Sequence, residues 1–432
     1  MKYYPLLLIM LFCSGIEAQT TDHFQERQDK IIQKFNQDLT IVASETHQGR
    51  KNLDFYYLTG EEADNSILML SPQSEGNILL FSDEIIETTF PAEIHPRGAF
   101  EKVVKQEIKS YNQVNVVNNY QVVFDRESVF KNVEKFRNIN DFLVNMRIIK
   151  DAQEIEYLRK ACKITAEGLN LVYENAEAGM TEKDLIEMMV SYFKEKGSAG
   201  ASFYQAASGP HSVNIHFDAT SRRIPNGDII VFDIGAWYNN YTADISRTIP
   251  MGGKFSKTQK ELYEVVLKAQ KAAIERMKPG TRLLDVQTVA ENILIEGLYE
   301  LGLVKDTESE WQRKLFIQHG FYHFIGLHVH DVWYDYRETL TDKKYKPGMI
   351  MTMEPGVYFP VDMLEERPNR IKEMVSEKEF NEFAKQIATV YEKYAGMGVR
   401  IEDDVLITED GNEVLTKDVP KEIEEIEEMM NQ

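Results

Sequence analysis

Short apolar runs separated by turn residues fill the first third of the chain. Residues 39–43, 54–58, 67–70 and 78–81 form such runs, and Gly60, Pro72 and Gly76 lie between them. Runs of this length predict strands, whereas the patterns at 19–38, 100–111 and 127–138 predict helices. Strands mixed with helices predict a small α/β domain over residues 19–149.

The apolar spacing changes near residue 150. Residues 154–173 predict a long amphipathic helix with Ile155, Leu158, Cys162 and Leu169 among its apolar positions. A second helix is expected after Thr181, because its hydroxyl can cap the helix while a carboxylate follows three residues later. We therefore place a second, larger domain at residues 150–432.

The start of this second helix has a counterpart further along the chain. Gly179 followed by Asp184-Leu185 recurs loosely as Gly280 followed by Asp285-Val286, 101 residues later, and each precedes a predicted helix. The repeat indicates an internal duplication, although a chance match explains it equally well.

Two strand-like runs joined by a polar turn lie at residues 227–250. A hairpin centred between Tyr238 and Asn239 would place Asp233 opposite Asp244, with Cβ atoms roughly 5 Å apart. At an effective dielectric constant of about 20, two such charges about 4 Å apart repel by roughly 4 kcal/mol. A divalent metal ion between them is the expected counter-charge.

Composition excludes some classes of partner. The 432 residues are 43% hydrophobic, which suits a large buried core, and the formal charge of −21 opposes nucleic acids and anionic lipid surfaces. The acidic tail at 420–432 predicts a solvated helix.

The N-terminus has the pattern of a secretory signal peptide at residues 1–18. Lys2 precedes a short apolar run, and a cleavage site is expected after Ala18. The run is too short to span a bilayer, and a buried N-terminal helix is the alternative. Export to the periplasm or outside the cell follows, with no membrane attachment after cleavage. Cys162 would then be the only cysteine, in a helix face expected to be buried and not catalytic.

Further metal-ligand side chains lie downstream of the hairpin. Individually they are weak indicators: two histidines four apart are more often incidental than metal-binding, and a Glu before Pro-Gly is usually a turn residue. Arg400 and Glu402 alternate on a strand-like run and could form a surface ion pair. The candidates are His216, His319, His323, His330, Glu354, Arg400 and Glu402.

Taken in chain order, the set resembles the five-ligand dinuclear metal site of the pita-bread metallopeptidases, the family of methionine aminopeptidase, aminopeptidase P, prolidase and creatinase. The set is Asp233, Asp244, His323, Glu354 and Glu402. The resemblance covers residues 150–416. His216, His319 and His330 fall where aminopeptidase P and prolidase carry theirs, and residues 50–60 look like the N-terminal domain of aminopeptidase P.

The resemblance implies an α/β (α+β) protein with a pita-bread catalytic domain after a smaller N-terminal domain. It implies hydrolysis of the bond between an N-terminal residue and a following proline, with a peptide as substrate. Asp244 and Glu402 would bridge two metals, Asp233 would complete one, and His323 with Glu354 the other. The mostly oxygen shell suits manganese.

The resemblance also implies catalytic roles. Glu354 would be the general base, and His216 and His330 would stabilise the tetrahedral intermediate, with His319 lining the pocket. Arg400 would relay protons with Asp233, and Tyr358 would hydrogen-bond nearby. Members of this family often form homo-oligomers.

Two alternatives remain open at the level of sequence. Prolidase, which cleaves only Xaa-Pro dipeptides, is the near relative; a non-catalytic peptide-binding relative is the second. The polar segment between Tyr358 and Gly398 departs from the compact family pattern, and its role at the site is not determined by the sequence.

Overall fold

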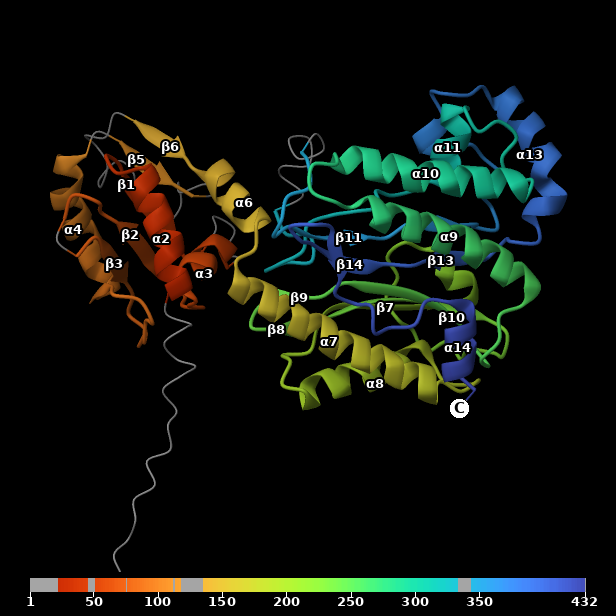
Figure 1. Ribbon diagram of the computed structural model, residues 1–432, viewed down its shortest axis with the longest axis horizontal. Coiled ribbons are helices and arrows are strands. Elements are labelled where there is room, and N and C mark those ends of the chain that lie inside the picture. The colour runs from red at the N-terminus through yellow and green to blue at the C-terminus, as the bar shows by residue number, and fades with distance from the viewer. Residues whose placement is uncertain are drawn as a thin grey trace, which may run out of the picture. The chain divides into compact units, whose positions relative to one another are not determined.

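A computed structural model describes residues 22–45, 51–74, 76–111, 113–117, 135–332 and 343–431. The chain divides between Met146 and Arg147 into two compact units, which are described separately (Figure 1). The predicted signal peptide lies outside the described residues. Every helix in the described ranges is too short or too polar to cross a bilayer.

The N-terminal unit is built on one six-stranded sheet with the order β4-β3-β2-β1-β5-β6. Its core is formed by apolar side chains of the central strands packed with Phe100 and Val104 of α4. Its elements are α2 (Asp22–Lys34), β1 (Leu39–Ala43), α3 (Leu53–Thr59), β2 (Ile67–Leu70), β3 (Ile78–Phe81), β4 (Glu93–His95), α4 (Phe100–Glu107), β5 (Val114–Val116), β6 (Phe136–Asn138) and most of α6 (Asn140–Ile148), which crosses the division between the units.

Two predictions in this unit are wrong. Residues 54–58 form helix α3 and not a strand, because Asn52 caps the helix by accepting a hydrogen bond from the Asp54 amide and Gly60 ends it at a φ of 73°. A five-residue apolar run cannot separate strand from helix. Residues 136–138, at the end of the predicted helix 127–138, form an edge strand paired with β5, and the part at 127–134 lies outside the described residues.

The C-terminal unit places helices on both sides of its strands. In Figure 1, α7 and α8 lie on one side and α9 and α10 on the other. Its helices are α7 (Ala152–Asn175), α8 (Glu182–Glu195), α9 (Lys257–Arg276), α10 (Leu283–Glu300), α11 (Glu310–Phe316), α13 (Glu377–Tyr391) and α14 (Ile423–Met429). Its strands are β7 (Ala201–Ser208), β8 (Ile229–Tyr238), β9 (Tyr241–Thr242), β10 (Ile245–Pro250), β11 (Ile350–Met353), β12 (Gly356–Tyr358), β13 (Gly398–Arg400), β14 (Asp403–Ile407) and β15 (Asn412–Val414).

The two helix starts that resemble each other in sequence also share backbone geometry. Gly179 and Gly280 both have positive φ, and each amide donates to a carbonyl in a distant segment, Ile224 and Tyr345 respectively. The capping box predicted at Thr181 is present, with Asp184 as its second member. These parallel hydrogen bonds favour duplication over a chance match.

The central hairpin forms, but its predicted register is wrong by one position in the turn. Asn239 and Asn240 both have positive φ (47° and 63°), so they are the two central residues of the turn. A two-residue turn with this backbone favours Asn at both positions. Asp233 therefore lies opposite Ser246, and Asp244 lies diagonally from it, just before β10.

The C-terminal tail is only partly solvated. Ile423 and Ile426 of α14 are buried, and the hydroxyls of Tyr173 and Tyr263 donate to the carbonyls of Pro420 and Lys421. The predicted solvated helix is thus wrong in its environment, because isoleucine recurs on one face of an otherwise acidic stretch.

Candidate metal centre

One cavity of about 740 Å³ in the C-terminal unit collects the predicted site residues. Those lining it are His216, Asp233, Asp244, His319, His323, His330, Glu354, Arg400 and Glu402. The tenth, Tyr358, is hydrogen-bonded to two of them. Strands, turns and loops from the whole unit supply these side chains, which are up to 186 residues apart in sequence (216 to 402).

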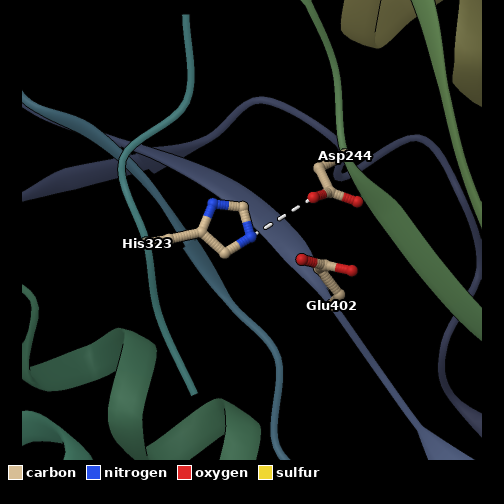
Figure 2. A group of neighbouring side chains, drawn as sticks. All are labelled: Asp244, His323 and Glu402. Atoms are coloured by element: carbon tan, nitrogen blue, oxygen red, sulfur yellow. Dashed lines mark ion pairs between the residues drawn. The ribbon is translucent and has the colours of Figure 1, made fainter. Parts of the chain in front are cut away.

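Asp244, His323 and Glu402 form the tightest group. Each offers one ligand atom, and these atoms lie within 4.8 Å of one another (Figure 2). Figure 2 shows the His323 ring pointing toward the two carboxylates, and its Nε2 is 3.4 Å from Asp244 Oδ2. All three residues are buried. The group could hold one metal ion without backbone movement.

The two buried carboxylates lack sufficient counter-charge within the described residues. Asp244 Oδ1 and Glu402 Oε1 are buried without a hydrogen-bond partner there. Burial and the neighbouring carboxylates, Asp233 beside Asp244 and Asp244 beside Glu402, raise both pKa values well above the usual range. A divalent cation would bind the free oxygens and favour the ionised forms, so these residues fit a metal site.

His323 has the tautomer that metal ligation requires. Its Nδ1 lies 3.2 Å from the carbonyl oxygen of Phe324, which can only accept, so Nδ1 carries the proton and Nε2 faces the carboxylates. Burial alone would lower the pKa of His323, but the hydrogen bond and charge of Glu354 raise it to about 9. A bound metal would displace the second proton from Nε2.

Glu354 remains ionised despite its burial. Burial by itself would raise its pKa, yet the hydrogen bond and charge of His323 lower it to about 2. Its Oε1 is 3.3 Å from His323 Nε2. A carboxylate that is ionised at neutral pH can act as ligand and proton acceptor.

Arg400 and Ser246 connect two of the candidate ligands. Arg400 Nη2 donates to Asp233 Oδ2 at 2.5 Å, and its Nε donates to Ser246 Oγ at 2.7 Å. Ser246 Oγ lies 2.7 Å from Glu402 Oε2 and 3.3 Å from Asp233 Oδ1. The arrangement fixes both carboxylates through bonds to buried groups.

The same arginine orients a tyrosine and a histidine. Arg400 Nη1 donates to the Tyr358 hydroxyl at 3.0 Å, and that hydroxyl lies 3.0 Å from His319 Nε2. Because His319 Nδ1 faces the Gly320 carbonyl at 2.8 Å, Nδ1 carries the proton and Nε2 accepts from Tyr358. Burial lowers the pKa of His319 and raises that of Tyr358 to about 12, so both are neutral at pH 7.

His330 and His216 complete the cavity wall. The His330 ring meets the His323 ring edge to face at 4.5 Å, and burial with the His323 charge lowers its pKa to about 4. The following residue, Asp331, is buried and pairs with Arg147 and Lys150. His216 follows Ile215, whose carbonyl accepts from Arg400.

Three polar residues that touch candidate ligands were missed by the sequence analysis. Ser246 and Gln205 flank Asp233 on the neighbouring strands, and Gln205 Nε2 donates to Asp233 Oδ2 at 2.6 Å. Asp404 accepts the Asp244 amide at 2.9 Å. The correct hairpin register would have indicated Ser246; nothing in the local sequence marks Gln205.

The segment between Tyr358 and Gly398 stays away from the cavity. None of the cavity-lining residues lies at 359–399, all of which are described. Helix α13 instead packs Phe380 and Phe383 against Trp311 of α11.

Comparison with known protein families agrees with this geometry. The model of metallopeptidase family M24 matches residues 156–409, more than half of the chain. The chain belongs to metallopeptidase family M24. Membership of this family implies a metallopeptidase that uses divalent metal ions, and Asp244, His323 and Glu402 form a candidate site for them.

Three proteins illustrate the similarity. An Xaa-Pro aminopeptidase of Haemophilus influenzae is 30% identical and covers 95% of this chain and 97% of its own. An Xaa-Pro dipeptidase of Homo sapiens is 33% identical over 67% of this chain and 61% of its own. The structure of Pseudomonas aeruginosa aminopeptidase PepP aligns with a TM-score of 0.80 at 26% identity, covering 95% and 98% of the two chains. The mixed α/β fold is that of a pita-bread metallopeptidase with an N-terminal domain.

Proposed function

We propose that this M24 metallopeptidase is an Xaa-Pro aminopeptidase, which removes the N-terminal residue from peptides with proline second. One observation carries the proposal: five metal-ligand side chains and three histidines converge on one cavity in a chain that is similar to aminopeptidases P along both of its units. A prolyl imide has no N–H, so clefts that read this donor handle it poorly and a dedicated enzyme is needed.

Two divalent ions, manganese in our proposal, would be held by Asp233, Asp244, His323, Glu354 and Glu402. Oxygen donors dominate this set, which suits manganese better than a thiolate-preferring metal. When bound, such ions supply a Lewis acid for the scissile carbonyl and acidify water at neutral pH.

The chain's own groups would handle the protons. Glu354, an ionised carboxylate in the cavity, would accept a proton from the attacking water as general base. Asp233 and Arg400 are joined by a 2.5 Å bond and form the proposed relay, while Tyr358 keeps Arg400 and His319 aligned.

His330 and His216 would serve the tetrahedral intermediate. His330 is uncharged at neutral pH, because its pKa is about 4, so it can donate one hydrogen bond to the developing oxyanion. His216 lines the same cavity and would protonate the leaving imide nitrogen. His319 has both ring nitrogens engaged and therefore lines the pocket without transferring a proton.

Dipeptidase activity is the second candidate, because a relative named Xaa-Pro dipeptidase is 33% identical. That similarity covers 67% of this chain, whereas the aminopeptidase similarity covers 95%. The wider coverage favours the aminopeptidase.

We further propose that the mature protein begins at Gln19, is exported to the periplasm or beyond, and forms a homo-oligomer. The apolar run after Lys2 supports export. Mass determination of protein recovered from the cell exterior or periplasm tests the cleavage, and light scattering tests the oligomer.

Hydrolysis by the manganese-loaded chain from Gln19 tests the activity. An Xaa-Pro dipeptide, an Xaa-Pro-Xaa tripeptide and longer peptides are compared at equal concentration. We expect cleavage of the tripeptide and longer substrates; cleavage of the dipeptide alone would make the enzyme a dipeptidase. Metal-loaded protein inactive on all three would instead indicate a peptide-binding relative.

A further inference from the structure

A second hollow lies directly beside the metal cavity. This hollow, here the α8 groove, has a volume of about 610 Å³ and is lined by residues of α8, β7 and the segment after His216. Tyr204 and Asp218 line both spaces. The two hollows therefore meet at these residues.

One face of helix α8 forms the long wall of the groove. Lys183, Glu187, Ser191 and Lys194 are exposed and recur every three or four residues, so they lie along one side of the helix. From Lys183 to Lys194 the wall is about 16 Å long at 1.5 Å per residue. This length accommodates about five extended residues at roughly 3.3 Å each.

The groove has an apolar floor and a rim of both charges. Ile186 and Ala219 are buried and Val190 is half-buried, and all three line the groove. Lys183 and Lys194 balance Glu187 and Asp218. Apolar floors with polar rims are typical of peptide-binding grooves, and the mixed charge suits backbone amides and varied side chains.

The wall between the two hollows is held by partly buried hydrogen bonds. The amide and hydroxyl of Thr220 donate to Glu182 Oε2 at 2.9 and 2.6 Å, and the Phe217 amide donates to Gln205 Oε1 at 2.6 Å. Asp218 lies between these two anchors. Tyr204 is 49% exposed at the same junction, so its ring is available to a ligand that passes from one hollow to the other.

We propose that the α8 groove binds the part of a peptide substrate downstream of the proline. The inference rests on the proposed Xaa-Pro aminopeptidase function. Because that reaction leaves a single residue before the scissile bond, all further length of a substrate lies on the proline side. A dipeptide ends before the groove, whereas a peptide of about seven residues can fill it.

The test obstructs the groove and compares two substrates. Ser191→Trp places an indole over the groove, and Glu195→Trp, on the last turn of α8 and outside the lining, is its control. The substrates are an Ala-Pro-Ala tripeptide and a seven-residue peptide that begins with Ala-Pro. We expect Ser191→Trp to raise KM about tenfold for the longer peptide and to leave the tripeptide and the control unchanged.

A charge-reversal pair keeps the inference testable if the tryptophan variant does not fold. Lys194→Glu is compared with Lys196→Glu, since both side chains are exposed near the end of α8 and only Lys194 lines the groove. With acidic residues at the distal end of the longer peptide, KM should rise severalfold for Lys194→Glu alone.

The outcomes separate this inference from the proposed function. Equal effects on both peptides, or no effect in either variant, would overturn the α8 groove as a substrate site while the aminopeptidase stands. If the unmodified enzyme cleaves neither peptide, the proposed function fails and the groove assignment falls with it.

Discussion

Two consecutive residues at the start of β14, Glu402 just before the strand and Asp403 as its first residue, are both buried carboxylates with opposite surroundings. Asp403 accepts from Arg247 and Thr416 on one oxygen and from Gln270 and Lys421 on the other. Glu402 accepts a hydrogen bond from Ser246 on one oxygen, and no described residue donates a hydrogen bond to the other.

Their pKa values show the consequence. Burial alone would raise both, but the charges of Arg247 and Lys421 lower the pKa of Asp403 far below its usual value. Burial and the charge of Asp244 raise that of Glu402 well above its usual value. Asp403 is thus neutralised by the protein's own cations, whereas one oxygen of Glu402 has no hydrogen-bond partner among the described residues and is open to a bound cation. Burial of an acid is therefore no evidence for a metal until its cationic partners are counted.

Removing Asp244, a carboxylate that faces the candidate metal position, should have the largest effect on metal binding and turnover. Asp244→Ala deletes a candidate ligand from the group of Asp244, His323 and Glu402, so we expect loss of tight metal binding and a fall in turnover of about a thousandfold or more. Elemental analysis after dialysis and a peptide hydrolysis assay measure both. Asp410→Ala, an exposed carboxylate after β14, is the control; metal and turnover retained in Asp244→Ala would contradict the site.

Removing Asp403, the carboxylate that is neutralised by the protein's own cations, should lower the stability of the fold. Asp403→Ala leaves Arg247 buried without its anion, so the free energy of unfolding should fall by about 3–5 kcal/mol. Urea denaturation of metal-loaded protein measures the loss. A change below about 1 kcal/mol would show that Arg247 finds another partner and would weaken the comparison.

Gln205 tests how far groups around the candidate ligands control metal affinity. It joins the candidate ligand Asp233 to the cavity wall that carries His216. Gln205→Leu removes the donor to Asp233 and the acceptor of the Phe217 amide. We expect metal affinity to fall about 10- to 100-fold, as for other groups that orient metal ligands. Competition with a chelator measures affinity, and Gln287→Leu, in the same cavity, is the control. Unchanged affinity would assign Gln205 a packing role.

The smallest expected effect is a pH dependence of metal-free protein. Raised pKa values of Asp244, Glu402 and His323 mean that their contributions to stability are present below the unfolded values and are lost as pH rises, for His323 between about 6.5 and about 9. Metal binding offsets this loss, so the gap in Tm between loaded and metal-free protein should widen by a few degrees from pH 6 to pH 9. Scanning calorimetry at both pH values measures it, and a constant gap would contradict the assigned ionisation states.

The sequence predicts which side chains gather at the cavity better than it predicts the groups that hold them in place. Strands 39–43, 67–70 and 78–81 are confirmed, because each is a short apolar run between turn residues. The helices predicted at 154–173 and after Thr181 are also confirmed, because capping residues and long periodic patterns act locally. The predicted register of the hairpin was wrong because the register depends on which two residues of the turn adopt positive φ, and these are Asn239 and Asn240. Gln205 and Asp404 could not be found, since their roles arise from strand pairing and tertiary contacts.

Cys162 is a buried thiol close to the candidate metal site, and its reaction with a thiol reagent would report local opening of the protein there. It is fully buried, as predicted, and its thiol lies 3.3 Å from Asp404, which in turn holds the Asp244 amide. Burial raises its pKa, so the folded protein should be nearly inert to thiol reagents. In a chain with Cys13 removed or replaced, the rate of alkylation would report how often α7 separates from β14. A single buried thiol would thus measure the rate at which the protein opens locally beside the candidate metal site.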